Sequence, residues 1–136
     1  MKAVLLALAL SVPSLPEEPS RVVIEPFQPF LTRFISDTPF RAQRIASPLP
    51  VRFGTEADTG VHNERWSPER VVKDLQVPLS KEALAKEGLS QEVRKVTPQV
   101  TEVFQFREEA DSYLFTYRFT LRRGKWYLTR VVDESM

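Results

Sequence analysis

The sequence predicts an α+β domain in which N-terminal helices pack on an antiparallel sheet. In the first third of the chain, phenylalanines recur at helical spacing between prolines. The last third alternates apolar and polar residues, as strands with one buried face do. A chain of 136 residues with 42% hydrophobic and 27% charged residues suits one globular domain. Helices followed by strands indicate separate layers, with the helices on one face of the sheet.

Residues 1–14 have the layout of a secretory signal peptide. Lys2 precedes an apolar run over residues 3–10, and Ala9 and Ser11 provide small residues at the spacing of a cleavage site. The run is shorter than the roughly 20 apolar residues of a membrane span, so no membrane insertion is expected once the signal is removed. The alternative is a buried N-terminal helix. Residues 15–20 are a Pro-rich tether and residues 21–136 the single α+β domain, which we expect to be exported.

The first expected helix runs from Pro26 to about Ser36. Its apolar face is formed by Phe27, Phe30, Leu31 and Phe34.

A second, short helix is expected directly afterwards. Asp37 or Thr38 caps it and Pro39 starts it. Two prolines, at positions 48 and 50, end it and impose extended backbone. Its expected buried positions are Phe40 and Ile45.

The middle of the chain predicts shorter elements. Residues 51–53 suit a short strand, and residues 54–64 a polar loop. Ser67 and Pro68 begin a segment that fits a short helix slightly better than a strand. Residues 81–87 suit a surface helix that Ser80 caps and Gly88 ends.

The clearest strands lie at residues 100–106, 113–121 and 125–132, the last two joined by a turn at Arg123-Gly124. A two-residue loop keeps the apolar residues of this hairpin on one face, whereas a three-residue loop would set aromatic residues opposite polar ones. The two-residue loop predicts the pairs Leu121–Trp126, Phe119–Leu128, Tyr117–Arg130 and Phe115–Val132.

Composition excludes several classes of chemistry. The sequence has no cysteine, so thiolate-zinc, iron–sulfur and cysteine-nucleophile sites are impossible, and its single histidine excludes two-histidine metal motifs. Loss of Lys2 with the signal peptide would leave equal numbers of acidic and basic residues. That balance argues against a nucleic-acid partner and against electrostatic binding to anionic membranes. No cofactor and no metal site are predicted.

Residues 37–45 read Asp-Thr-Pro-Phe-Arg-Ala-Gln-Arg-Ile, Pro48-Leu49 follow, and the final hairpin contains Gly124-Lys125-Trp126-Tyr127-Leu128. This combination resembles a family of small secreted bacterial proteins of unknown function, over roughly residues 27–132. The resemblance implies a cystatin-like cone of the nuclear transport factor type. In that fold a curved antiparallel sheet wraps around N-terminal helices and leaves a pocket between them. The resemblance implies no activity.

Two residue sets are candidates for chemistry. His62, with Glu56, Asp58 and Glu64, could form a general base or part of a metal site, and the alternative is an exposed loop histidine. Arg130 shares the predicted aromatic face with Tyr117 and Trp126, which makes these three the ligand-binding candidates. An arginine there needs a carboxylate, a ring or a ligand anion, unless it reaches water at the open end of the sheet. No catalytic residue is assigned.

Asp37, Phe40 and Arg44 are expected to have a structural role, with Arg44 pairing with Asp37 and the start of the Pro48-Leu49 segment. The functional expectation is an exported, non-enzymatic binding or interaction domain for a small ligand or a protein segment. The alternatives are a small enzyme on the same scaffold and a structural envelope-associated protein.

Export is directly testable. N-terminal sequencing of the protein from the producing cell should find a mature chain that begins between Val12 and Pro16, because the small residues of the signal lie just before that stretch. Intact Met1 on protein recovered from the cytoplasm would contradict the prediction.

Overall fold

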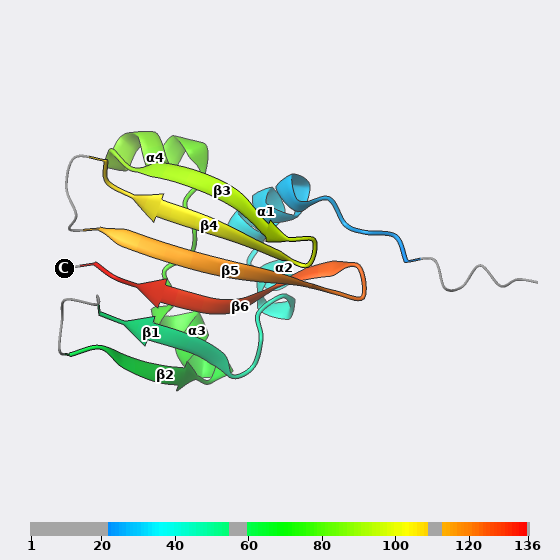
Figure 1. Cartoon of the computed structure of the whole chain (residues 1–136), viewed down its shortest axis with the longest axis horizontal. Coiled ribbons are helices and arrows are strands. Elements are labelled where there is room, and N and C mark those ends of the chain that lie inside the picture. The colour runs from blue at the N-terminus through cyan, green and yellow to red at the C-terminus, as the bar shows by residue number, and fades with distance from the viewer. Residues whose placement is uncertain (1–21, 55–59, 109–112, 136) are drawn as a thin grey trace, which may run out of the picture.

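The computed structural model describes residues 22–54, 60–108 and 113–135. In these residues the chain forms four helices and a six-stranded sheet, and the helices all lie on one side of the sheet (Figure 1). The prediction of an α+β domain is confirmed. No helix in the described part of the chain is both long enough and apolar enough to cross a membrane.

The first two helices match the sequence prediction. Helix α1 covers Phe27–Ser36 and buries Phe30, Leu31 and Phe34. Helix α2 covers Thr38–Gln43 and buries Phe40. The carboxylate of Asp37 caps α2 by accepting a hydrogen bond of 3.1 Å from the Phe40 N–H.

Helices α3 (Pro68–Asp74) and α4 (Lys81–Glu87) connect the two edges of the sheet. Ser67 and Ser80 cap them through their side-chain oxygens. Gly88 ends α4 at a φ of 71°, a left-handed conformation that glycine adopts without strain.

The strands are β1 (Leu49–Phe53), β2 (His62–Trp66), β3 (Ser90–Thr97), β4 (Val100–Phe106), β5 (Leu114–Arg122) and β6 (Lys125–Asp133). Their order across the sheet is β2-β1-β6-β5-β4-β3. Strands β3 to β6 form an antiparallel meander that returns the chain to β1, and β6 pairs with β1 in parallel. The sheet is therefore mixed, with one parallel pair among antiparallel ones.

Two strands differ from the sequence prediction. Residues 62–64, expected in a loop, begin β2, whose polar residues lie on an edge strand. Strand β3 was not predicted, because six of its eight residues are exposed at the other edge and show no apolar alternation.

The core lies between α1 and the inner face of the sheet. The ring of Phe119 is fully buried, and three rings of α1 contact it at centroid distances of 5.3 to 5.6 Å. Those rings belong to Phe27, Phe30 and Phe34. Aromatic side chains of the helix thus fill the concave side of the sheet.

The β5–β6 hairpin keeps the predicted register only near its turn. Arg123 (φ 53°) and Gly124 (φ 81°) form the two-residue turn. Leu121 pairs with Trp126 and Phe119 with Leu128, as predicted, but Thr129 then has no partner on β5.

This β-bulge reverses the face of every later residue of β6, so Tyr117 pairs with Val131 instead of Arg130. The Thr129 hydroxyl stabilises the bulge by donating to the Arg118 carbonyl over 3.3 Å. Because of the bulge, Val131 enters the core and Arg130 leaves it.

The burial of Trp126 predicts a large effect of truncation. Trp126→Ala should lower the free energy of unfolding by about 3–5 kcal/mol, the cost of removing a large core ring. Val72→Ala, at an exposed position of α3, is the control and should change it by less than about 0.5 kcal/mol. Urea denaturation measures the free energy of unfolding of both variants. If Trp126→Ala lowered it as little as Val72→Ala does, the indole would not be part of the core.

Candidate functional site

Two of the three predicted ligand-binding residues lie in the core. Tyr117 is 0% exposed, and its hydroxyl donates to the Gln76 carbonyl over 2.7 Å. Burial raises the pKa of this phenol strongly. Trp126 is 5% exposed, and its indole N–H donates to the Glu25 carbonyl over 2.9 Å. Both polar groups are therefore occupied by partners within the chain.

Arg130 lies on the opposite face of the sheet from Tyr117 and Trp126, because of the bulge at Thr129. The structure does not bring the three candidates together. Arg130 is opposite Arg118 of β5 and belongs to the sheet face that no helix covers, which is turned to the viewer in Figure 1. Sequence alternation alone could not reveal this, since a single inserted residue inverts the pattern.

A shallow groove of about 550 Å³ lies beside Arg130 on this open face. It extends over β1, β2 and β6 and is lined by Pro50, Val51, Arg52, Asn63, Glu64, Arg65 and Arg130. The register explains why three arginines meet there. Pro50 is opposite Arg65, and the parallel pairing of Val51 with Val131 places Arg130 beside Pro50. Arg52 follows Pro50 on the same face of β1.

The arginines of this groove lack acidic partners. Arg52, Arg65 and Arg130 form no ion pair or side-chain hydrogen bond with any described residue. We call the groove that these three arginines line the arginine groove. A guanidinium without a carboxylate is a site at which an anion can bind by two parallel hydrogen bonds.

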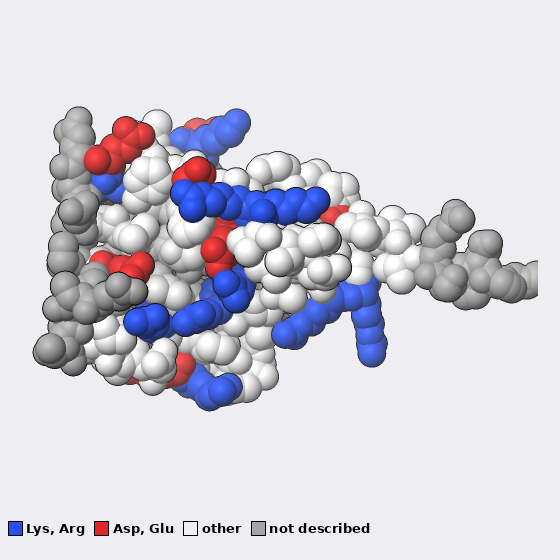
Figure 2. Space-filling model, in the orientation of Figure 1, with Lys and Arg blue, Asp and Glu red and all other residues white. Residues whose placement is uncertain are grey.

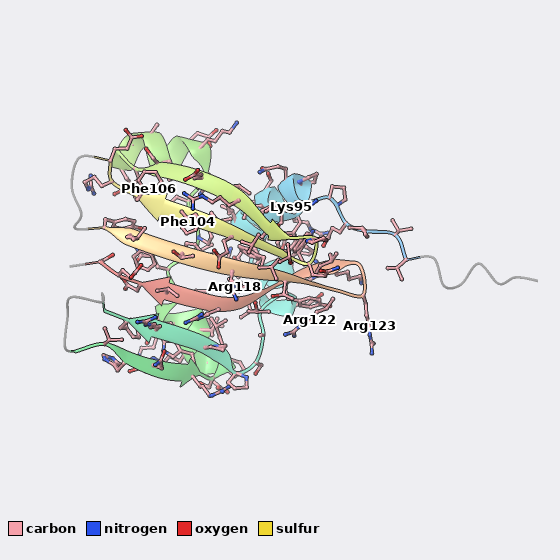
Figure 3. The ribbon with its side chains drawn as sticks, in the orientation of Figure 1. Lys95, Phe104, Phe106, Arg118, Arg122 and Arg123 are labelled. Atoms are coloured by element: carbon pink, nitrogen blue, oxygen red, sulfur yellow. The ribbon has the colours of Figure 1, made fainter. Side chains whose placement is uncertain are left out.

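In the middle of the open face two other arginines are neutralised. Arg118 pairs with Glu102 over 2.9 Å, and Arg94 pairs with Glu92 over 3.1 Å. Figure 3 shows Arg118 in the middle of this face, and Figure 2 shows basic and acidic side chains alternating over the same strands. The charge of the arginine groove is therefore local to β1, β2 and β6.

Glu64 borders the groove but is already occupied. It accepts a hydrogen bond from the Trp66 indole and pairs with Arg70, each over 3.0 Å. The hydrogen bond from Trp66 and the positive charge of Arg70 lower the pKa of Glu64, although partial desolvation opposes them. Glu64 thus stays ionised and turned toward Arg70.

His62 lies at the start of β2 and is exposed. Its Nδ1 is 2.9 Å from the Gly60 carbonyl oxygen, its Nε2 is 3.6 Å from Glu64, and its ring stacks on Phe53. Glu56 and Asp58, proposed as its acidic partners, lie outside the described residues. Within the described part of the chain, no three potential metal ligands come together.

The structural motif is assembled differently from the prediction. Arg44 pairs with Glu25 instead of Asp37, over 2.7 Å and 3.2 Å, and donates to the Trp126 carbonyl over 3.2 Å. Its guanidinium also lies 4.5 Å from the centroid of the Phe40 ring. Asp37 instead caps α2 and contacts Arg33. No local pattern indicated Glu25 as the partner, because it precedes Arg44 by 19 residues.

A second depression of about 460 Å³ lies between α1 and α4. Leu31 and Ile35 form its apolar side, and Lys81 and Glu82 are opposite charges at its rim. Among its lining residues, Gln91 donates to the Leu79 carbonyl and to Gln105 over 3.1 Å each. This amide is therefore already paired within the chain, in contrast to the guanidinium groups of the arginine groove.

No family model matches the sequence, and no curated protein matches it. Among solved structures, the chain is similar to an NTF2-like protein from Bacteroides fragilis, with a TM-score of 0.60 and 14% identity. The match covers 92% of this chain and 51% of that protein, so this chain spans about half of its length. A domain of unknown function with a cystatin-like fold from Nostoc punctiforme matches with a TM-score of 0.40 and 11% identity. That match covers 78% of this chain and 68% of the other.

The Bacteroides fragilis structure shows that the fold of this chain is NTF2-like, as the sequence resemblance implied. Fold alone does not assign a ligand, since one scaffold carries many unrelated functions. A functional proposal for this chain therefore has to come from its own residues.

The Arg44–Glu25 pair makes stability depend on pH. Partial burial raises the pKa of Glu25, but hydrogen bonds from Arg44 and the Trp126 N–H and the charges of Arg44 and Lys125 outweigh it, so the pKa is lowered. Because the folded value lies below the unfolded one, the stabilisation is present at neutral pH and is lost as the pH falls through the folded value.

Urea denaturation should therefore find wild type more stable than Glu25→Gln at pH 7, with the difference shrinking below about pH 4. Glu69→Gln, on exposed α3, is the control. A difference between wild type and Glu25→Gln that stays constant from pH 7 to pH 3 would contradict this account.

Proposed function

We propose that this protein is an exported, non-enzymatic binding domain that captures an oxyanion, a carboxylate or phosphate of a small ligand, in the arginine groove. One observation carries the proposal: three arginines line one groove, and no carboxylate of the described residues pairs with them. The signal-like layout of residues 1–14 supports export.

The sheet fixes the spacing of these groups. Neighbouring strands lie about 4.8 Å apart, so the backbones of Arg130 and Arg65, with Pro50 between them, are separated by about 10 Å. Arginine side chains are long enough to converge from that spacing on one oxyanion. Because the positions belong to paired strands, little backbone ordering is needed on binding.

The strand pairing also favours a ligand over an internal partner for Arg130. Arg130 lies directly opposite Arg118, and like charges opposite each other on a sheet destabilise it. Glu102 compensates Arg118 but not Arg130. An anion bound beside Arg130 would relieve that repulsion, so binding should stabilise the folded protein.

The test replaces Arg130 by Met, which keeps the apolar stem and removes the charge. Calorimetric titration with inorganic phosphate and, separately, with succinate distinguishes the two anion classes. We expect Arg130→Met to weaken binding of the preferred anion about tenfold or more, since hydrogen bonds to charged groups contribute about 1.5–3 kcal/mol. Its melting temperature without ligand should be equal to or higher than that of wild type.

Arg94→Met is the matched control, because Arg94 lies on the same face and is already paired with Glu92. It should leave anion binding unchanged. Equal affinities of wild type and Arg130→Met for both anions would contradict the proposal. So would a loss of about 3–5 kcal/mol in stability on this substitution, which would indicate a stranded buried acid.

A further inference from the structure

One end of the molecule gathers the turns of both long hairpins and the start of the described chain (Figure 1). The Glu25 N–H donates to the Gly124 carbonyl over 2.9 Å, which ties the N-terminal segment to the β5–β6 turn. The Leu121 N–H donates to the Gln99 carbonyl over 2.7 Å, which ties that hairpin to the β3–β4 turn. We call this region the hairpin end.

Exposed aliphatic side chains are concentrated at the hairpin end. Six large hydrophobic residues are exposed in the described part of the chain, and four of them lie there. They are Val22 (55% exposed), Val23 (88%), Ile24 (60%) and Val96 (51%). Consecutive aliphatic residues exposed to this degree are unfavourable in water unless another surface covers them.

Basic side chains surround these aliphatic residues. Lys95, Arg122 and Arg123 are exposed and form no ion pair with any described residue, and Figure 3 shows them toward this end. Exposed Lys125 follows the turn. The nearby acid, Glu25, is bonded to Arg44 and Trp126. In Figure 2 the acidic side chains lie mainly toward the other end of the molecule.

We propose that the hairpin end docks on an anionic phospholipid surface, with residues 22–24 and Val96 in the interface and the basic side chains at the headgroups. Aliphatic residues ringed by Lys and Arg are the combination that binds such surfaces. The equal numbers of acids and bases do not oppose this, because screening confines the attraction to charges within about 10 Å of the membrane.

The hairpin end is separate from the arginine groove. The groove lies on the open face over β1, β2 and the later part of β6, whereas the hairpin end holds the two turns and the start of the described chain. The two proposals are therefore independent.

The full chain has no cysteine, so single cysteines can report which part of it meets a membrane. An environment-sensitive fluorophore is attached to Val23→Cys and, as the matched control, to Val72→Cys, a valine of α3 that is 82% exposed. Each protein is titrated with phosphatidylglycerol/phosphatidylcholine vesicles and with vesicles of phosphatidylcholine alone. The label at position 23 should shift to shorter wavelength with the anionic vesicles only, and the label at position 72 should not shift.

The charge contribution is tested in the same labelled chain. Lys95→Gln combined with Arg122→Gln should weaken binding to the anionic vesicles about 25-fold, since each basic residue at such a surface contributes about 1 kcal/mol, or roughly fivefold. Lys73→Gln combined with Lys86→Gln removes two exposed charges from α3 and α4 and should leave binding unchanged. High salt should abolish most of the difference in vesicle affinity between the parent chain and the Lys95→Gln, Arg122→Gln variant.

Three results would overturn the proposal. An equal shift with phosphatidylcholine vesicles would mean that the chain meets lipid without any preference for anionic headgroups. An equal shift at position 72 would mean that the hairpin end has no preferred contact. Loss of the position-23 shift on addition of millimolar glycerol phosphate would mean that the basic residues bind a free anion and not a surface.

Discussion

The joint between Glu25, Arg44 and Trp126 connects the three parts of this fold. Glu25 precedes α1, Arg44 follows α2, and Trp126 is the second residue of β6. Arg44 binds the Glu25 carboxylate and the Trp126 carbonyl, while Trp126 donates its backbone and indole N–H groups to Glu25. The polar groups of these three residues thus form hydrogen bonds with one another in a region that largely excludes water. Removing one partner would leave the others unpaired. This constraint holds the aromatic face of α1 against the sheet.

The joint has consequences for where binding can occur. Because it presses α1 onto the sheet, the rings of Phe27 and Phe30 occupy the concave face that a cone of this type could otherwise leave hollow. The two surfaces that we propose for binding are the arginine groove on the open face and the hairpin end. The arginine groove presents charge without exposed aliphatic side chains, whereas the hairpin end combines charge with exposed aliphatic side chains. Their different chemistry leads to different proposed partners, a small oxyanion and a lipid surface.

Much of the fold could be predicted from local patterns. The caps at Asp37, Ser67 and Ser80, the helical spacing of Phe30 and Phe34 and the Arg123-Gly124 turn are all as predicted, because each depends on residues within one or two turns of chain. Strand β3 escaped prediction because an exposed edge strand needs no apolar alternation. The candidate site was predicted least well. Arg130 was identified as an anion-binding candidate, but Arg52 and Arg65 were not, and Tyr117 and Trp126 proved to be core residues.

The sequence by itself determined the α+β class, four helices and four of the six strands, and the unusual position of an arginine near the end of an apolar strand. Only the tertiary structure decided which face that arginine occupies and which partner Arg44 has. Both outcomes depend on contacts between distant segments. The Thr129 bulge places Val131 in the core and turns Arg130 outward, because burying the aliphatic side chain costs less than burying an unpaired guanidinium. Arg44 meets Glu25 because α1 and α2 fold back on each other, which no local pattern records.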